Sequence, residues 1–266
     1  FVAWRLVNEE LTGRLHDVQH CTQALSHDLP DAALLPAGAL HISMAFLRIT
    51  TTAELQAAAC VMKTSIPKLL AKHMPTRKAS KLKFAGLGMF GSRVLYTAPD
   101  GRRAAPQQRL FDLQLAIEEE FVSSGLQVTP IARFWDPRNP SPGVSHHNGF
   151  APHVSIVRVT PRTNAMGDEA GAADGSGAVK GDVRVPTSAV AQGTEADGTP
   201  KEWGEDSLRG LYLCSMNAPM GADGFYTHVA RVSHPAFEAK AAPAVQVPPA
   251  ALQVPGLQRQ SSLPDS

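Results

Sequence analysis

Apolar residues recur along the chain with two periods, one typical of α-helices and the other of β-strands. Three stretches have a spacing close to 3.6 residues and predict helices. The first is capped by Asn8, and the second is opened by the capping box of Thr51 and Glu54. Pro67 lies inside the second stretch and is expected to kink it. The apolar faces are Leu11, Leu15, Val18 and Leu25; Leu55, Met62, Ile66 and Leu69; and Leu110, Leu113, Ile117 and Phe121.

Short apolar runs bounded by glycine, proline and polar residues predict the strands. The runs are residues 1–6, 40–50, 81–98 (a β-hairpin), 126–130, 150–160, 208–216 and 224–233. The resulting order, β-α-β-α-β-β-α-β-β-β-β, mixes helices with strands, and several of the strands can only pair antiparallel. We therefore predict an α+β fold rather than a doubly wound parallel sheet.

Two segments lack the apolar side chains that a core needs. Residues 161–200 are rich in small and polar residues, and they are expected to be a disordered insertion without a function of its own. Residues 236–266 are rich in Pro, Ala and Gln, and they are expected to be a disordered tail. The prediction is thus one folded domain over residues 1–235. Because the chain starts at Phe1 rather than Met, we expect it to be a fragment or an excised domain.

Composition narrows the class of protein. The formal net charge of the 266 residues is +1, so no global field favours DNA or an acidic membrane, although a local basic cleft would suffice for a nucleotide. Cys21, Cys60 and Cys214 are odd in number and form no C-x-x-C pair, which predicts neither a disulfide framework nor a zinc site. No apolar run approaches the roughly 18 residues of a membrane span. We expect an intracellular protein, cytoplasmic or nuclear.

One tetrapeptide pattern, His–apolar–Ser–apolar, occurs twice. The copies are His41-Ile42-Ser43-Met44 and His153-Val154-Ser155-Ile156, each in a strand-like run and each in its own half of the domain. Side chains alternate between the faces of a strand, so the His and Ser of each copy share a face, while the apolar residues point into a core. A lone His-x-Ser is usually structural, whereas two copies favour a shared site.

Neighbouring strands would bring the two imidazoles and two hydroxyls of these motifs into one cleft. One neutral His would take a proton from a hydroxyl or water, and the other, protonated, would donate one to a leaving oxygen. The hydroxyls of Ser43 and Ser155 would bind non-bridging phosphate oxygens. His41, Ser43, His153 and Ser155 are therefore the expected catalytic residues. This chemistry cleaves phosphodiesters without a metal or other cofactor, and the sequence does not assign acid and base.

The two motifs are the signature of the two-histidine (2H) phosphoesterase superfamily, and the chain resembles that superfamily. Among its members it is most similar to the central domain of A-kinase anchoring protein 7-like proteins. The similarity covers residues 1–235 outside the insertion. It is carried by residues 84–97 (FAGLGMFGSRVLYT), 150–156 (FAPHVSI), 203–206 (WGED), 211–216 (LYLCSM) and 224–228 (GFYTH).

This resemblance implies a bilobal, pseudo-twofold 2′-5′ RNA ligase-like fold, with antiparallel sheets lining a central cleft and helices outside. It implies a phosphodiesterase whose partner is a nucleotide or short RNA, with no membrane. The first-choice substrate is a 2′,5′-linked oligoadenylate, and a 2′,3′-cyclic phosphate RNA end is second. The alternative is a non-catalytic module of a larger scaffold protein that senses AMP-like nucleotides. Kinase anchoring is not expected, because no amphipathic helix is recognisable in the Pro-rich tail.

Five further residues are candidate nucleotide contacts. Phe90, Phe150 and Tyr226 could stack on a base, although aromatic residues in such positions are more often part of a core. The resembled family tends to carry an Arg before its aromatic-Gly-Glu stretch, where this chain has Lys-Glu. Lys201 or Arg209 is the expected replacement for that phosphate contact.

Overall fold

A computed structural model describes residues 1–26, 28–129, 152–160 and 183–238 of the chain. The strands of these described residues form one open, antiparallel sheet of nine. The order is β7-β3-β4-β6-β2-β1-β8-β9, with β5 paired to β2 beside this path. The strands are β1 (Val2–Arg5), β2 (His41–Arg48), β3 (Lys81–Phe90), β4 (Val94–Pro99), β5 (Gln127–Thr129), β6 (Val154–Arg158), β7 (Glu202–Ser207), β8 (Gly210–Cys214) and β9 (His228–Ser233). Antiparallel strands mixed with helices confirm the α+β class.

Apart from β5, the sheet divides into two halves of four strands each. One half is β7-β3-β4-β6 and the other is β2-β1-β8-β9, so β6 and β2 are the innermost strands and pair antiparallel with each other. These two innermost strands carry the two His–Ser motifs. The arrangement matches the bilobal, pseudo-twofold fold expected from the resemblance.

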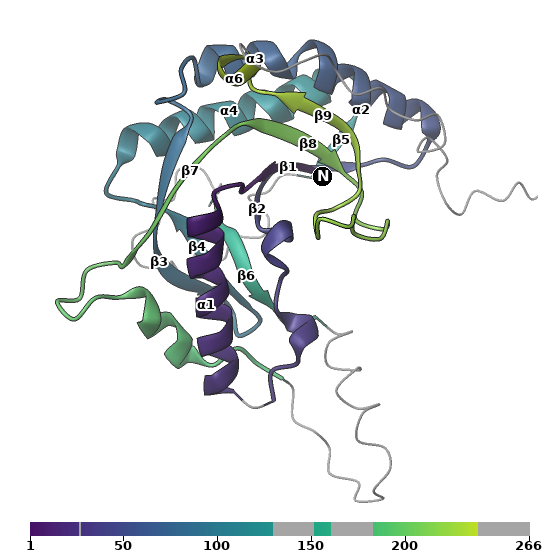
Figure 1. The fold of residues 1–266 in the computed structure, drawn as a ribbon. Coiled ribbons are helices and arrows are strands. Elements are labelled where there is room, and N and C mark those ends of the chain that lie inside the picture. The colour runs from purple at the N-terminus through teal and green to yellow at the C-terminus, as the bar shows by residue number, and fades with distance from the viewer. Residues whose placement is uncertain (27, 130–151, 161–182, 239–266) are drawn as a thin grey trace, which may run out of the picture.

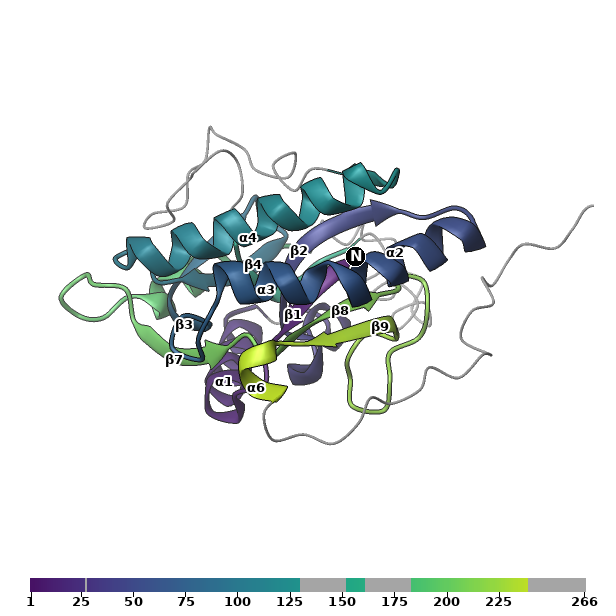
Figure 2. The same cartoon turned by 90° about the horizontal axis from the view of Figure 1, so that it is seen from above.

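Helices cover the outside of both halves, as Figures 1 and 2 show. The helix α1 packs against β6 and β7 of the first half. On the second half, α2 and α3 pack against β9, and α4 lies between α3 and β2. The helices are α1 (Glu9–Leu25), α2 (Thr52–Thr64), α3 (Ile66–His73), α4 (Ala104–Ser123) and the short α6 (Pro235–Glu238).

Local chemistry explains where these helices begin and end. The Asn8 side chain accepts hydrogen bonds from two amides of the first turn of α1. Thr51 and Glu54 form the expected capping box at the start of α2. The structure at Pro67 differs from the expected kink within one continuous helix. The chain ends α2 at Thr64 and starts α3 at Ile66, which places Pro67 in a first turn where its missing N–H costs nothing.

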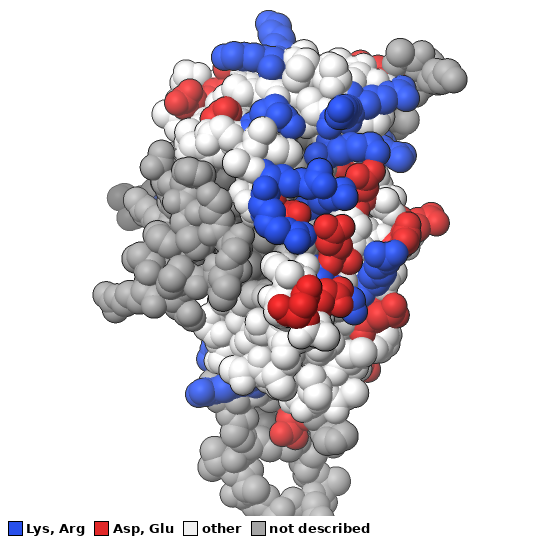
Figure 3. Space-filling model, turned by 90° about the vertical axis from the view of Figure 1, so that its left-hand side faces the viewer, with Lys and Arg blue, Asp and Glu red and all other residues white. Residues whose placement is uncertain are grey.

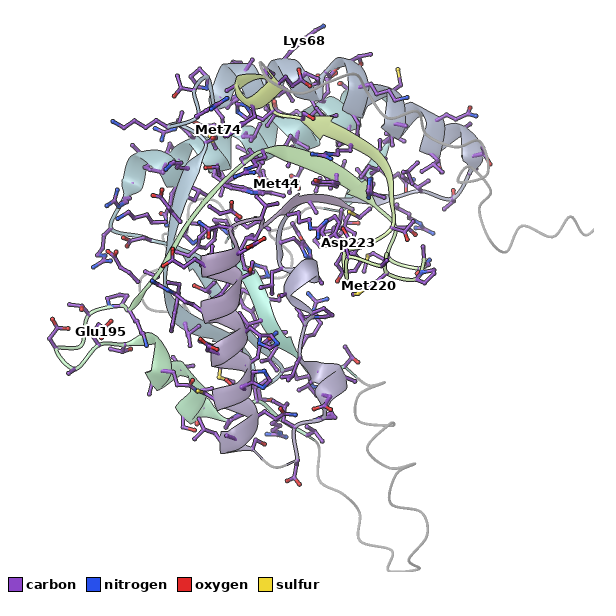
Figure 4. The ribbon with its side chains drawn as sticks, in the orientation of Figure 1. Met44, Lys68, Met74, Glu195, Met220 and Asp223 are labelled. Atoms are coloured by element: carbon purple, nitrogen blue, oxygen red, sulfur yellow. The ribbon has the colours of Figure 1, made fainter. Side chains whose placement is uncertain are left out.

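The main core lies between the sheet and the helices. Its largest fully buried side chains include Trp4, Phe84, Phe121 and Met44, the last labelled in Figure 4. Most residues of the predicted apolar faces are buried in this core or packed against it. The exceptions are Leu55 of α2, which is half-buried outside the core cluster, and Leu25 at the end of α1, which is 51% exposed. Burying such side chains stabilises the fold by about 25 cal/mol per Å² of apolar area removed from water.

The structure corrects one expectation about residues 161–200. Residues 161–182 lie outside the described residues, as does the tail from residue 239. Residues 183–200 are described, and they contain a 3-10 helix over Thr187–Gly193 with Val185 and Ala189 buried in the core. The expectation of a disordered segment is therefore wrong for residues 183–200, because two apolar side chains anchor it.

Candidate active site

The pairing of β2 with β6 determines how the two motifs meet. Ile42 lies directly opposite Val154 in the antiparallel register, and both side chains are fully buried in the core. His41 and Ser43 flank Ile42, and His153 and Ser155 flank Val154, so these four side chains occupy the other face of the sheet. Each His therefore lies across from the Ser of the other motif. This crossed arrangement gives one face two imidazoles and two hydroxyls.

His41 is held at this face by hydrogen bonds on both sides of its ring. Its Nδ1 lies 2.7 Å from the carbonyl oxygen of Ala39, and its Nε2 lies 3.2 Å from Oγ of Ser43. A carbonyl oxygen only accepts, so Nδ1 carries the proton in the neutral ring and Nε2 keeps its lone pair. The nitrogen that faces the Ser43 hydroxyl is thus the basic one.

Burial determines the charge of His41. The residue is only 8% exposed, and its pKa is lowered from 6.5 to about 4, mainly by loss of solvation. The hydrogen bond to Ala39 acts in the opposite direction, and electrostatic interactions with Arg158 and His153 contribute to the lowering of the pKa. His41 is therefore neutral at physiological pH. Because His153 acts electrostatically on His41, the two imidazole rings lie close enough to influence each other.

His153 is bordered by aromatic rings from β3 and β4. The ring of Phe90 meets it edge-on at 4.7 Å between centroids, and the ring of Tyr96 lies at 5.5 Å. Phe90 and Tyr96 in turn stack on each other at 4.2 Å. Gly88 makes this packing possible, because a Cβ there would lie 2.6 Å from the Tyr96 ring.

Arg158 is a site residue that the sequence analysis missed. Its Nη2 donates to Oγ of Ser155 over 3.4 Å, and its charge acts on His41. Strict alternation would place Arg158 and Ser155 on opposite faces of β6. An irregularity in the pairing with β4 inserts one residue between them, so Arg158 faces Val94 on the same side as Ser155. Only the position of Arg158 close after the second motif could have suggested it.

Tyr96 also went unnoticed in the sequence, where it is one aromatic among several in a predicted hairpin. Of the expected base contacts, Phe90 lies beside His153, and the ring of Tyr226 meets His41 edge-on at 5.3 Å. Phe150 lies outside the described residues. Each histidine therefore has one of the expected aromatic side chains next to it.

The two expected phosphate contacts lie elsewhere. The ammonium group of Lys201 lies 5.1 Å from the centre of the Trp203 ring, in a hollow that it shares with Arg14 and Asp17 of α1. Arg209 lines a separate hollow with Asn8 at the start of α1. The helix α1 covers the core side of β6, so the structure separates Lys201 and Arg209 from the His–Ser pairs.

Within residues 1–26, 28–129, 152–160 and 183–238, no cluster of three His, Cys, Asp or Glu side chains is arranged to bind a metal ion. In the same ranges, none of the helices has the length and apolar character needed to cross a membrane.

Comparison of the sequence with protein families gives one clear result. The model of the AKAP7 2′5′ RNA ligase-like domain matches residues 1–233, which is most of the chain. This match agrees with the resemblance drawn from the motifs. A comparison with curated protein sequences finds no match.

The solved structures that this chain matches include two complexes of one protein, Escherichia coli LigT, and a structure described as a phosphoesterase. Escherichia coli LigT complexed with 3′-AMP has 17% identity and a TM-score of 0.42, covering 88% of this chain and 97% of its own. The same LigT complexed with ATP has 17% identity and a TM-score of 0.41, covering 88% and 96%. A structure described as a phosphoesterase has 17% identity and a TM-score of 0.40, again covering 88% and 96%. These TM-scores are below 0.5, so the family assignment depends on the sequence match.

Proposed function

Since the chain belongs to the family of AKAP7 2′5′ RNA ligase-like domains, we propose that it is a phosphodiesterase acting on nucleotide or RNA phosphodiesters. One observation carries the proposal. The Ile42–Val154 register gives a single face of the sheet two His–Ser pairs in crossed positions. General acid and general base groups on opposite sides of one phosphate are what in-line cleavage of a phosphodiester needs, and no metal is required for it.

His41 is the general base in this proposal. It is neutral at physiological pH, and its Nε2 carries the lone pair. In the free protein the Ser43 hydroxyl occupies this acceptor. A bound substrate would replace that contact with a ribose hydroxyl or a water, whose proton passes to Nε2 as its oxygen attacks phosphorus.

His153 is the general acid. As the bond from phosphorus to the leaving oxygen breaks, protonated His153 donates to that oxygen, so the charge on the leaving group is neutralised. The Ser155 hydroxyl and the Arg158 guanidinium, 3.4 Å apart, would bind the non-bridging phosphate oxygens and stabilise the developing negative charge. The two histidines then exchange protonation states, and water restores them.

The preferred substrate in this proposal is a 2′,5′-linked oligoadenylate, with a 2′,3′-cyclic phosphate RNA end as the second choice. The family match supports the first choice. Phe90 beside His153 and Tyr226 beside His41 offer aromatic surface on both sides of the reacting phosphate, where the two flanking bases would stack.

Cleavage of 2′,5′-linked and 3′,5′-linked triadenylate in EDTA tests the proposal. The wild type is compared with a His41→Ala/His153→Ala double variant. The matched control is His16→Ala/His20→Ala, which removes two exposed histidines from α1. We expect the wild type and the control to cleave the 2′,5′ substrate, and the active-site variant to lose at least about a thousandfold in rate, because acid and base each contribute about 10²-fold or more.

Two outcomes would refute catalysis by the histidine pair. Equal cleavage by the wild type and the active-site variant would show that another group does the chemistry. If the wild type leaves both substrates intact but binds AMP only when His41 and His153 are present, the protein is a nucleotide sensor. Isothermal titration with AMP, using the same three proteins, distinguishes that case.

A further inference from the structure

The face of the sheet that carries the His–Ser pairs continues along β3 away from them. At the start of β3, Lys81 and Lys83 alternate with Leu82 and Phe84, which are buried in the core. Lys81, Lys83 and Ala85 therefore point to the other side of the strand. That side is the site face, as the pairing of the neighbouring strands establishes.

The register connects this side of β3 to Ser155 in three steps. Ala85 lies opposite Ala98 on β4, and two residues earlier on β4 Tyr96 shares the face of Ala98. Tyr96 lies opposite Ser155 on β6. The site face thus extends without interruption from Ser155 to Lys81. Along β3, the nine steps from Lys81 to Phe90 span about 30 Å at roughly 3.3 Å per residue.

A groove of about 390 Å³ lies on the part of this face between the aromatic residues and the lysines. Several of the residues that line it have little or no side chain, among them Ala85, Gly88 and Ala98, and the lining extends to Arg102. Gly193, Gly198 and Pro200 also line the groove. Lining residues this small leave room for a nucleobase.

Beyond the groove lies a second hollow of about 420 Å³ with a basic lining. It is lined by Lys78, Lys81, Lys83, Arg103, Arg109 and one acidic residue, Glu205. Figure 3 shows Lys and Arg side chains gathered on this side of the molecule, with acidic side chains next to them. We call this hollow the basic pocket.

The acidic neighbours leave part of the positive charge uncompensated. Glu205 pairs with Lys81, Glu202 pairs with Lys83 and Arg102, and Asp100 pairs with Arg102 and Arg103. With Arg102 of the groove included, six basic residues thus lie beside three acidic ones. The basic residues are Lys78, Lys81, Lys83, Arg102, Arg103 and Arg109.

Two of the six basic residues, Lys78 and Arg109, form no ion pair within the described part of the chain. Moreover, Nε of Arg109 is buried there without a hydrogen-bond partner. A buried N–H that lacks an acceptor is unfavourable, and an anion in the pocket would supply the missing acceptor. The first turn of α4 adjoins the pocket and contains no acidic residue, so its free amides add to the positive potential.

We propose that the groove and the basic pocket form an extended binding site for a nucleic acid strand that leaves the catalytic site, with a base in the groove and phosphates in the basic pocket. The identity of the ligand rests on the proposed function. The site selects an oligonucleotide of several residues over a mononucleotide, because only a strand of that length spans from His153 to Lys81. Its phosphate contacts make binding salt-dependent.

Fluorescence anisotropy with a labelled single-stranded RNA 12-mer tests this site. All proteins carry His41→Ala/His153→Ala, so the RNA is not cleaved. The pocket variant adds Lys78→Gln/Arg103→Gln/Arg109→Gln. The control variant adds Lys63→Gln/Lys68→Gln/Lys72→Gln, which removes the same charge from α2 and α3. Lys68 points outward from the helical layer in Figure 4.

We expect the pocket variant to bind about tenfold more weakly than its parent at 0.1 M salt, and the control variant to bind within about twofold. The slope of log K against log salt should become shallower by about 2 in the pocket variant, because each phosphate contact on a single strand contributes about 0.7. Urea midpoints verify that the variants are folded. If the triple variant unfolds, the exposed substitution Lys78→Gln gives the same test with about a threefold loss.

Equal losses in the pocket and control variants would overturn the proposal, because net charge alone would then explain the binding. Unchanged affinity in the pocket variant would overturn it too. The proposal would also be overturned if the parent protein bound vesicles of 30% phosphatidylserine but did not bind the RNA. Cleavage of a 2′,5′-linked dinucleotide by the wild type tests the proposed function separately. A pocket effect on RNA without such cleavage would retain the binding site and refute the phosphodiesterase.

Discussion

Burial of neutral His41 makes stability depend on pH in a way that a single substitution removes. The pKa of His41 is about 4 in the folded protein, against 6.5 when the ring is exposed in the unfolded chain. Between these two values the unfolded state binds more protons, so stability is lost as the pH falls from 6.5 to 4. The difference of about 2.5 pKa units corresponds to about 3 kcal/mol, at about 1.4 kcal/mol per unit.

Urea unfolding of the wild type and a His41→Gln variant at pH 7.5 and pH 4 measures this contribution. Gln keeps a polar side chain but does not titrate. His73 and His234 also have pKa values lowered by burial, and both remain in the two proteins. Their effects therefore cancel in the comparison. We expect the wild type to lose about 3 kcal/mol more than the variant between the two pH values.

Parallel losses in the two proteins would refute the reasoning, because His41 would then titrate alike in the folded and unfolded states. The assignment of His41 as general base would lose its support with it. A second readout comes from activity. A base with a pKa of about 4 keeps its lone pair in weak acid, so kcat/KM should not fall with the ionisation of His41 until the pH approaches 4.

Gly88→Ala and Thr51→Ala test the packing at Tyr96 and the N-terminal cap of α2. Gly88→Ala places a Cβ 2.6 Å from the buried Tyr96 ring, so it should cost about 1–3 kcal/mol in urea unfolding and lower kcat by displacing the ring beside His153. Gly13→Ala is the control, since nothing lies within 4 Å of that position on α1, and it should stabilise by up to about 1 kcal/mol. Thr51→Ala removes the capping box of α2 and should cost about 1 kcal/mol, which a matched urea titration detects; no change would mean that the cap is replaced by water.

The crossed placement of the motifs has a consequence for the chemistry. Each His lies across from the Ser of the other motif, so a phosphate between them would be contacted symmetrically. The surroundings remove that symmetry. His41 is buried with its Nδ1 on a carbonyl oxygen, whereas His153 is partly exposed and borders Phe90 and Tyr96. Similar motifs in different environments would thus act as base and acid.

Local sequence determined most of the secondary structure and the identity of the motif residues. The Asn8 cap and the Thr51–Glu54 capping box act through hydrogen bonds within a few residues, so they can be recognised from the sequence without knowledge of the fold. The strand alternation around Ile42 and Val154 likewise fixed which side chains share a face. From these patterns alone, an α+β fold with two His–Ser strands could be predicted.

The strand β7 shows where the local pattern fails. Its sequence, Glu-Trp-Gly-Glu-Asp-Ser, is mostly polar and lacks the apolar alternation of a strand, and it was not predicted as one. It exists because β3 offers it a hydrogen-bonding edge and because Trp203 donates to the Gly86 carbonyl oxygen at 2.8 Å. Residues 183–200 are similar, since Val185 and Ala189 are too few to predict a structured segment but find a place in the core.

Tertiary structure alone decided how the functional groups meet. The sequence supplied two His–Ser pairs, but only the pairing of β2 with β6 sets Ile42 against Val154 and crosses the pairs. Arg158 reaches Ser155 because one extra residue in β6 reverses the alternation, and no local pattern marks that residue. The groove and the basic pocket combine strands, loops and α4 from distant parts of the chain. Such contacts depend on register and packing between elements, which a pattern within one element does not contain.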